Sequence, residues 1–308
     1  MVKKRKSSAQ SLTPNSQPLL ITPRLLHEWP LPQPDADSDK EGRGRVLVVG
    51  GSPEMPGACV LAATAAARAG AGKLQIATVA SVAVAVAVAV PEARVFALTQ
   101  TRTGALAAAG VAQLVEYVNA AQAVLVGPGM IDERANARFM RSLLARVAGG
   151  PVLVLDANAL TSLARAPERV QALHGRVILT PHAEEMGELL GTDKTKVARN
   201  RVRALKEAVA RFNATVVFKG RETLIAAPGS RVYRNRAGNV GLATSGSGDT
   251  LAGLIAGLAA RGAEPVQAAV WGVYLHARAG ERLARRRGPL GYLARELPDE
   301  FPTLLAEM

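Results

Sequence analysis

A glycine-rich loop directly before a helical pattern is the strongest chemical signal in the chain. Residues 245–253 read Ser-Gly-Ser-Gly-Asp-Thr-Leu-Ala-Gly, and apolar residues at helical spacing follow. The backbone N–H groups of Gly246, Ser247 and Gly248 can point to one place at the positive end of that helix, where proteins bind phosphate oxygens. Asp249 would be an ionised carboxylate able to accept a proton from a hydroxyl that attacks a phosphoryl group. The loop therefore predicts a phosphoryl-transfer site, although a simple turn with Asp249 as N-cap would have the same residues.

Four further segments carry glycines or polar side chains at the ends of short apolar runs. Residues 218–223 read Phe-Lys-Gly-Arg-Glu-Thr, in which Gly220 would let backbone approach a ligand and Lys219 supplies a positive charge. Open α/β sheets bind ligands beyond the carboxyl ends of their strands, so each segment is a candidate for the site. Each also fits an ordinary turn or helix start, including His182. The other three segments are 126–129 (Val-Gly-Pro-Gly), 156–158 (Asp-Ala-Asn) and 180–182 (Thr-Pro-His).

The apolar runs alternate with longer helical patterns, which is typical of βαβ units and a mostly parallel sheet. A hairpin is predicted where residues 223–227 and 231–234 flank Pro-Gly-Ser. Residues 81–90 alternate Ala and Val, a pattern that fits a strand and equally a short buried helix ended by Pro91. The predicted parallel strands are 45–49, 74–79, 123–126, 152–156, 177–180 and 215–218.

Composition limits the class of protein. The 308 residues are 48% hydrophobic, which suits one large α/β domain, and we expect it to span residues 43–308. Residues 1–42 read as a basic, Pro- and Ser-rich tail with a docked end around residues 25–29. The single cysteine, Cys59, excludes an internal disulfide and a cysteine-built zinc site. Without an apolar signal core or a long apolar stretch, we expect a cytoplasmic protein that spans no membrane.

The formal net charge of +13 indicates an anionic partner or an Arg-rich genome. Residues 1–42 hold six basic and five acidic side chains, so the excess lies in the folded part. Aromatic residues are only 4%, which leaves little for bases to stack on. The G-x-G-x-x-G and Walker lysine motifs are missing, so neither a Rossmann dehydrogenase nor a P-loop NTPase is supported. With four histidines, no metal-ligating cluster is apparent.

Taken in order, these segments resemble the ADP- or ATP-dependent NAD(P)H-hydrate dehydratases, a branch of the ribokinase-like superfamily. The resemblance covers nearly the whole chain, and several motifs in the same order and spacing are far more specific than any one of them. The matching segments are 44–52, 55–58, 127–129, 155–160, 179–182, 219–220, 245–253, 273–280 and 297–298.

The resemblance implies a ribokinase-like α/β fold, with a central mostly parallel sheet between helices, and a reaction that repairs hydrated nicotinamide cofactors. The 6-hydroxyl of the S-epimer of hydrated NADH or NADPH would receive a phosphoryl group from ADP or ATP. Phosphate would then leave to regenerate the reduced nicotinamide, with AMP as the product of ADP. Mg²⁺ would bridge the phosphates, and the protein would be a homo-oligomer, most often a tetramer. Residues 1–42 are too few for the epimerase domain often fused to these enzymes, so a separate epimerase or slow spontaneous exchange would convert the R-epimer.

The resemblance also assigns residues to roles, and it implies no metal-ligating side chain. Asp249 would be the base, with Gly246, Ser247 and Gly248 as the anion hole. The hydrated cofactor would contact Ala58, Gly129, His182 and Asp249. The adenine nucleotide would contact Lys219, Gly220, Arg221, Glu222, Thr223 and Gly248.

Two local departures and two alternatives stay open. The family often has His-Pro-Gly-Glu where residues 182–185 read His-Ala-Glu-Glu, and a His-Lys-Gly is replaced at 39–41. A small-molecule kinase of the same superfamily, such as a thiazole- or pyrimidine-alcohol kinase, would share the Gly-Ser-Gly-Asp loop and leave a stable phosphoester. A nucleic-acid-binding protein is a more remote alternative, with residues 285–287, three arginines, as its best basic patch.

Overall fold

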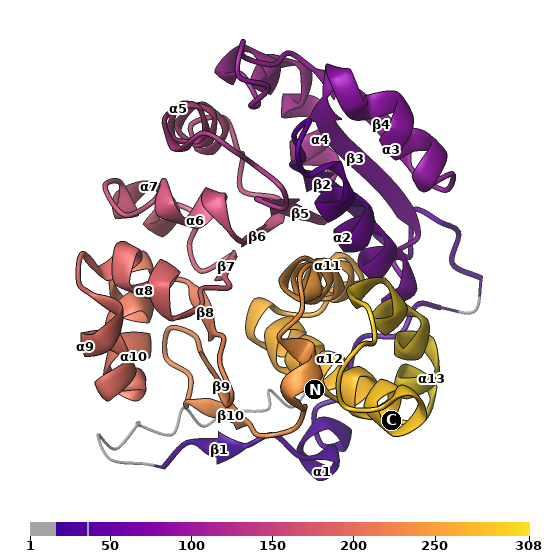
Figure 1. The fold of residues 1–308 in the computed structure, drawn as a ribbon, viewed down its shortest axis with the longest axis vertical. Coiled ribbons are helices and arrows are strands. Elements are labelled where there is room, and N and C mark those ends of the chain that lie inside the picture. The colour runs from indigo at the N-terminus through magenta and orange to yellow at the C-terminus, as the bar shows by residue number, and fades with distance from the viewer. Residues whose placement is uncertain (1–16, 36) are drawn as a thin grey trace, which may run out of the picture.

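A ten-stranded sheet runs through the middle of the molecule (Figure 1). The computed structural model describes residues 17–35 and 37–308, and the basic residues 3–6 lie outside this part. The strand order is β1-β10-β9-β8-β7-β6-β5-β2-β3-β4. Neighbouring strands are parallel except that β9 is antiparallel to both β8 and β10. The strands are β1 (Leu19–Leu20), β2 (Arg45–Val49), β3 (Lys73–Val79), β4 (Arg94–Leu98), β5 (Ala123–Val126), β6 (Val152–Leu155), β7 (Val177–Leu179), β8 (Thr215–Phe218), β9 (Thr223–Ala226) and β10 (Tyr233–Asn235).

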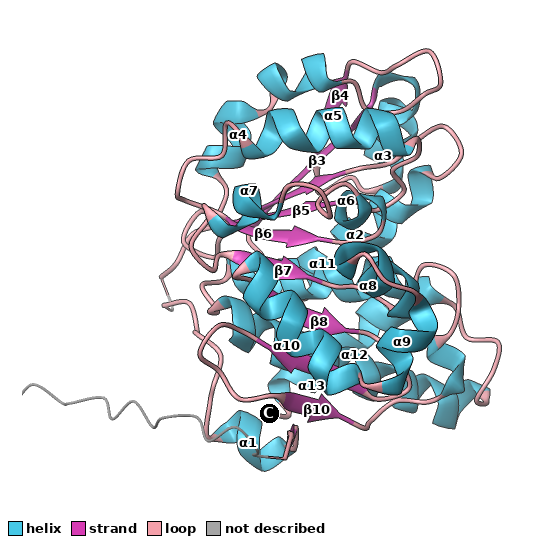
Figure 2. Ribbon diagram, turned by 90° about the vertical axis from the view of Figure 1, so that its left-hand side faces the viewer, coloured by secondary structure: helices cyan, strands magenta, loops and turns pink. Residues whose placement is uncertain are grey.

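Helices cover both faces of the sheet (Figure 2), which is the α/β architecture predicted from the sequence. Alternate residues of one strand reach opposite cores: Val46 and Val48 of β2 join one, and Leu47 and Val49 the other. The first core is completed by α1 (Pro23–His27), α2 (Pro56–Arg68), α3 (Ala83–Ala89), α11 (Ser247–Ala260), α12 (Pro265–Arg287) and α13 (Phe301–Ala306). The second is completed by α4 (Val115–Ala120), α5 (Glu133–Leu144), α6 (Asn158–Thr161), α7 (Pro167–Gln171), α8 (Ala183–Leu190), α9 (Lys194–Arg199) and α10 (Arg201–Phe212).

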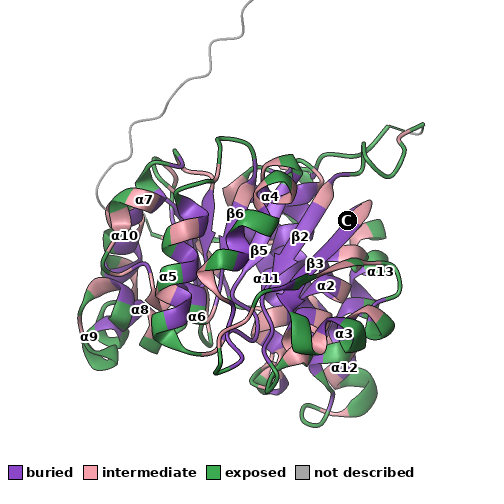
Figure 3. Ribbon diagram, turned by 90° about the horizontal axis from the view of Figure 1, so that it is seen from above, coloured by how far each residue is buried: buried purple, intermediate pink, exposed green. Residues whose placement is uncertain are grey.

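The central strands are buried on both sides, whereas the outer helix surfaces are exposed (Figure 3). This explains why the six parallel strands could be predicted: strands buried on both faces are continuous apolar runs. The edge strand β4 was not predicted, although four of its five residues, Arg-Val-Phe-Ala-Leu, are apolar. In the structure these residues are mostly half-buried or exposed. Within the described residues, four short 3-10 helices connect elements, namely η1 (Ala80–Val82), η2 (Ala108–Gln113), η3 (Val240–Leu242) and η4 (Ala294–Glu300).

The two ambiguous segments have definite structures. The Ala/Val alternation forms η1 and then α3, with Val86 buried and Val84 and Val88 exposed, so the helical interpretation is correct. The predicted hairpin is present, but its second strand, β10, begins at Tyr233 rather than at residue 231. Ahead of Arg43, where the sequence predicted the fold to begin, β1 pairs with β10 and α1 buries Leu26.

The N-terminal end of α11 is placed by unusually close packing on α2. A Cβ atom added to Gly253 would lie 2.1 Å from the carbonyl oxygen of Ala62, and one on Gly257 would lie 2.6 Å from that of Ala66. These glycines therefore let the two helix backbones approach more closely than any side chain would allow. The contact fixes the depth at which α11 meets the carboxyl ends of the strands.

Substituting Gly253 by Ala should destabilise the protein, because the new methyl group would force α11 away from α2. We expect a loss of about 1–3 kcal/mol in the free energy of unfolding, or more if the helices cannot separate. Gly57→Ala in α2 is the matched control, since nothing lies within 4 Å of the place that its new methyl group would take. Urea unfolding of both variants checks the expectation, and equal stabilities would contradict the packing argument.

Candidate active site at the carboxyl ends of the strands

The Gly-Ser-Gly loop opens α11 with an uncapped N terminus. Gly246 is the N-cap residue and adopts a left-handed conformation, with φ +84°. No side chain of the described residues caps this helix, but the Ser247 N–H donates to the Thr244 carbonyl at 3.2 Å. The N–H groups of Gly248 and Asp249 are the ones that remain available to a ligand in the first turn. Asp249 lies in the first turn instead of at the N-cap, which removes the simple capping explanation for it.

Asp249 occupies a half-buried position among other charged groups. Burial raises its pKa, the Asp156 carboxylate raises it further, and Lys219 opposes both, giving a value of about 7. A carboxyl group with a pKa near neutrality can accept and release a proton under physiological conditions, which suits a general base.

Lys219 links the strand ends to the α11 loop. It follows β8, and its backbone N–H donates to the carbonyl of Pro181 at 2.8 Å. Its ammonium lies 2.9 Å from Asp156 Oδ1 and 3.7 Å from Glu185 Oε2. A Cβ atom added to Gly248 would lie 3.7 Å from the same ammonium nitrogen. Burial alone would lower the pKa of Lys219, but the two carboxylates outweigh it and hold the pKa above its ordinary value. The lysine is therefore cationic and directed at the glycine loop.

Asp156 is the buried partner of this lysine. It follows β6, its side chain is 3% exposed, and its Oδ1 accepts hydrogen bonds from Lys219 Nζ and, at 2.6 Å, from Thr180 Oγ1. A Cβ on Gly127, whose φ is +133°, would lie 1.8 Å from the Asp156 carbonyl oxygen. Glycine is thus required beside this aspartate, which explains the Gly-Pro-Gly segment after β5.

His182 combines a structural role with a place at the strand ends. It is the N-cap of α8, where its Nδ1 accepts from the N–H groups of Glu184 and Glu185 at 3.1 and 3.4 Å. Glu185 returns the contact, since its carboxylate accepts from the His182 N–H at 2.8 Å. Burial opposes ionisation of Glu185, but His182 and Lys219 outweigh it and lower its pKa. Glu185 therefore connects His182 to Lys219. It also completes the capping box of α8, although residues 183–184 differ from the Pro-Gly that the family often has there.

Ala58 and Gly129 lie side by side, as expected of residues that line one ligand. A Cβ on Gly129, where φ is +67°, would lie 3.0 Å from Ala58 Cβ and 2.4 Å from the Met55 carbonyl oxygen. The loops that carry them are tied together because Gly51 N–H donates to the Pro128 carbonyl at 2.7 Å. The next residue, Cys59, is buried, and burial together with the Asp249 charge raises its pKa. This side of the site therefore adjoins Asp249.

The residues predicted to bind nucleotide divide into two groups. Lys219 joins the carboxylates, and Gly220 packs against Arg201, whose guanidinium donates to the carbonyls of Phe218 and Lys219 at 3.0 and 3.1 Å. The turn beyond them faces β10: Glu222 Oε1 accepts from Arg236 Nε at 2.9 Å. Arg221 is exposed and Thr223 begins β9.

Comparison with known proteins identifies the family. The model that describes NAD(P)H-hydrate dehydratases matches residues 46–303. The chain belongs to the NAD(P)H-hydrate dehydratase family. It is 45% identical over 260 residues to an ADP-dependent (S)-NAD(P)H-hydrate dehydratase of Xanthomonas campestris pv. campestris, covering 84% of this chain and 87% of that protein.

Solved structures agree with this family and with the ribokinase-like fold. The ADP/ATP-dependent NAD(P)H-hydrate dehydratase of Bacillus subtilis, co-crystallised with ATP and Mg²⁺, superposes with a TM-score of 0.74 at 30% identity, covering 90% of this chain and 94% of that one. A ribokinase-like superfamily protein of Enterococcus faecalis V583 gives a TM-score of 0.79 at 25% identity, covering 99% and 98%. Bifunctional NAD(P)H-hydrate repair enzymes among the relatives are longer, and this chain spans about half of their length.

Several residues of this dehydratase site were not among the predicted site residues. Asp156, Thr180 and Glu185 stand within segments that the sequence singled out, but their contacts depend on which strands are neighbours. His276 of α12 is buried, and its Nε2 donates to the Ser247 carbonyl at 3.1 Å. Burial lowers the pKa of His276 to about 4, so it anchors the first turn of α11 as a neutral ring.

The described residues offer no ready-made metal cage or membrane segment. Among residues 17–35 and 37–308, no three His, Cys, Asp or Glu side chains are grouped as metal ligands would be. Within the same part of the chain, no helix combines the length and hydropathy that crossing a bilayer demands.

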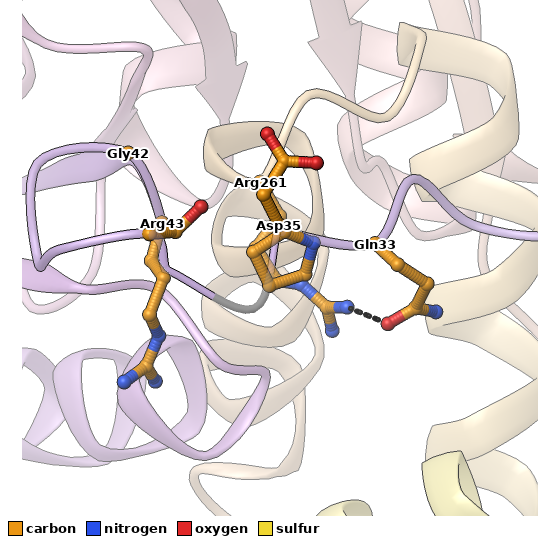
Figure 4. Close-up of a pocket in the computed structure, with 7 residues that line it drawn as sticks. Gln33, Asp35, Gly42, Arg43 and Arg261 are labelled. Atoms are coloured by element: carbon orange, nitrogen blue, oxygen red, sulfur yellow. Dashed lines mark hydrogen bonds between the residues drawn. The ribbon is translucent and has the colours of Figure 1, made fainter.

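A cavity of about 170 Å³ is lined by residues that include Gln33, Arg43 and Arg261 (Figure 4). Arg261 is the C-cap residue of α11, whereas Asp249 lies in its first turn, so the cavity is at the opposite end of this helix from Asp249. Arg261 follows α11 there and donates to the Ala69 carbonyl at 2.8 Å and to Gln33 Oε1 at 3.3 Å. Arg43, just before β2, also lines this cavity, which places it at the amino ends of the strands. It is therefore separate from the site around Asp249.

The raised pKa of Asp249 predicts a pH-dependent gain in stability for Asp249→Asn. The folded state retains the proton up to about pH 7, whereas the unfolded chain releases it near the ordinary value. Stability therefore falls as pH rises through this window. The neutral amide escapes that loss, so the variant should exceed the parent by about 1–3 kcal/mol above neutral pH and match it near pH 4.

Urea unfolding at the two pH values checks this expectation. Asp193→Asn is the control, because Asp193 caps α9 through Thr195 and Lys196 N–H groups and has a lowered pKa. That variant should show no gain at high pH. A parent-like pH dependence for Asp249→Asn would contradict the environment described for this carboxyl group.

Proposed function

We propose that the chain dehydrates the S-epimer of hydrated NADH or NADPH at the expense of ADP, through the residues gathered around Asp249. The observation that carries the proposal is the meeting of three features: a carboxyl group with a pKa of about 7, a lysine ammonium and the uncapped N terminus of α11. Phosphoryl transfer needs positioning and charge neutralisation more than covalent participation by the protein, and this arrangement supplies both. The named relative of Xanthomonas supports the substrate and the donor.

In the first step, the 6-hydroxyl of the hydrated ring attacks the β-phosphorus of ADP. The new bond joins the hydroxyl oxygen to phosphorus, the bond from phosphorus to the bridging oxygen breaks, and AMP leaves with that electron pair. Asp249 accepts the hydroxyl proton as the bond forms. The N–H groups of Gly246 and Gly248, together with Lys219, stabilise the negative charge on the transferred group. The Ser247 N–H, which the resemblance also placed in the anion hole, donates to the Thr244 carbonyl at 3.2 Å and would have to leave it to take part.

In the second step, the carbon–oxygen bond breaks and inorganic phosphate leaves. The electron pair of the ring nitrogen assists this departure, and loss of a proton from the adjacent ring carbon restores the double bond. Phosphate is a much better leaving group than hydroxide, which is the purpose of the first step. Ala58, Gly129 and His182 would line the hydrated cofactor, and Lys219, Gly220, Arg221, Glu222, Thr223 and Gly248 the nucleotide.

Mg²⁺ fits this site as a companion of the nucleotide. It usually keeps several waters and binds one or two carboxylates together with substrate phosphates. Asp156 and Glu185 already contact Lys219, so phosphate oxygens and water would be the main ligands of the ion. When bound, Mg²⁺ would neutralise charge on the phosphates; positioning the hydroxyl and accepting its proton fall to the chain itself.

We also propose a cytoplasmic homotetramer that works beside a separate epimerase. The support for the tetramer is the family resemblance, and the buried single thiol of Cys59 suits a reducing compartment. The longer bifunctional relatives support a functional link to an epimerase, which would convert the R-epimer to the form this chain uses.

The direct test mixes the protein and Mg²⁺ with hydrated NADH and follows recovery of the reduced-nicotinamide absorbance. We expect recovery with ADP that stops when the S-epimer is consumed, and none without nucleotide. ATP in a parallel reaction determines whether the second donor is accepted. Folded protein that gives no recovery with either nucleotide would overturn the proposal, and accumulation of a stable phosphoester from a vitamin-precursor alcohol would favour the kinase.

Asp249→Ala should nearly abolish turnover while leaving nucleotide binding largely intact. The substitution removes the base but not the N–H groups that hold phosphate, so we expect a loss in kcat of about 100-fold or more. Turnover measured in the recovery assay and ADP affinity measured by calorimetry check both parts. Near-normal turnover of this variant would show that another group accepts the proton.

A further inference from the structure

We propose that Asp156 is a positioning residue that holds the Lys219 ammonium in front of the N terminus of α11. The inference rests on the proposed function. It adds Asp156, a residue that is not among those proposed to contact the substrate or the nucleotide. Asp156 and Lys219 are 63 positions apart in the sequence, and their side chains meet at 2.9 Å because β6 and β8 flank β7 in the sheet.

The Asp156 carboxylate is fixed from several directions. Thr180 Oγ1 donates to Oδ1 at 2.6 Å, and the Asp156 N–H donates to the Val126 carbonyl at 3.1 Å. Gly127 packs so closely against the Asp156 carbonyl oxygen that no side chain would fit between them. Three adjacent strand ends therefore build a rigid acceptor for one flexible side chain.

Lys219 gains direction from this acceptor. A lysine has a four-carbon stem and three donors, so without a partner its ammonium would sample many positions. Asp156 and Glu185 occupy two sides of the ammonium, and the remaining side faces Gly248. Held in this way, the positive charge lies where a phosphoryl group bound at the α11 N–H groups would pass between donor and acceptor.

The same carboxylate affects the protonation of Asp249. The charged groups that act on Asp249 are Lys219 after β8 and Asp156 after β6, and Cys59 of α2 is a neutral neighbour. One contact further away, Glu185 on α8 lies against Lys219, and the neutral His276 of α12 binds the Ser247 carbonyl. Asp156 raises the pKa of Asp249 and Lys219 lowers it. Removing the Asp156 charge should therefore lower the pKa of Asp249.

Asp156→Asn tests the proposal, because the amide keeps the shape and loses the charge. We expect kcat to fall at least tenfold, while the KM for ADP changes less than threefold, since removing a negative charge does not weaken ground-state attraction for phosphate. The acidic limb of the kcat/KM profile should move to lower pH. A kcat within twofold of the parent, or an unmoved acidic limb, would overturn the proposal.

A double-mutant cycle separates positioning from general damage. If Asp156 acts through Lys219, Asp156→Asn should change kcat less than twofold in a Lys219→Met background. An undiminished effect in that background would overturn the proposal. Asp193→Asn, at the exposed N-cap of α9, is the matched control and should leave kcat and the pH profile unchanged.

A second pair of variants serves if Asp156→Asn does not fold. Thr180→Val removes the hydroxyl that holds Asp156, and it should lower kcat in the same direction, whereas Thr180→Ser should restore it. Parent-like kcat in Thr180→Val would overturn the proposal. The parent is measured first. A parent that restores no reduced nicotinamide contradicts the proposed function. An active parent whose variants keep the parent kcat contradicts only the role of Asp156.

Discussion

The close approach of α11 to α2 is the constraint on which the rest of the site depends. Gly253 and Gly257 let the helix lie against the Ala62 and Ala66 carbonyls, and the buried His276 ring binds the Ser247 carbonyl at its start. Gly246 then turns the chain into the helix in a left-handed conformation. These contacts hold the first three turns of α11 in place. They therefore hold Asp249, in the first turn, beside the carboxyl ends of the strands.

That location gives the site its electrostatics. Asp249 is partly removed from water and lies near Asp156, so its charged form is disfavoured, and the lysine between the carboxylates prevents a larger shift. A carboxyl group of this kind reduces the stability of the fold at neutral pH, but it supplies a base whose pKa matches its task. A buried ion pair such as Asp156 with Lys219 is weak evidence for stability, and we infer that this pair is kept for the position it gives the ammonium.

The sequence predicted those parts of the fold that depend on local pattern. Six buried parallel strands and the hairpin were recognisable from apolar runs and from Pro-Gly-Ser, whereas the edge strands β4 and β1 were not predicted. β1 has only two residues, but β4 contains the apolar run Val-Phe-Ala-Leu, which is as long as that of β5. For residues 81–90 the sequence left two structures equally open, because Ala favours a helix and the alternation favours a strand. In the structure this segment forms α3, which packs against β4 and α2 with Val86 in the core, and these contacts are not contained in any local pattern.

The site was predictable to the level of segments but not of contacts. The structure brings Asp249, Lys219, His182 and the glycine loop to one edge of the sheet, and their assigned roles remain predictions. Asp156, Thr180 and Glu185 were overlooked as site residues, because their importance follows from the order β6-β7-β8 rather than from any motif. An aspartate directly after the apolar run 152–155 was a signal that could have indicated the first of them.

The most direct test of the central claim follows the oxygen atom that leaves the hydrated ring. Hydrated NADH carrying heavy oxygen in its 6-hydroxyl is incubated with the protein, ADP and Mg²⁺, and the inorganic phosphate is analysed by mass spectrometry. Phosphorylation-assisted dehydration predicts one heavy oxygen in each phosphate released and an equal amount of AMP. Unlabelled phosphate, with the label in water, would show that the hydroxyl leaves without phosphorylation and would contradict the account.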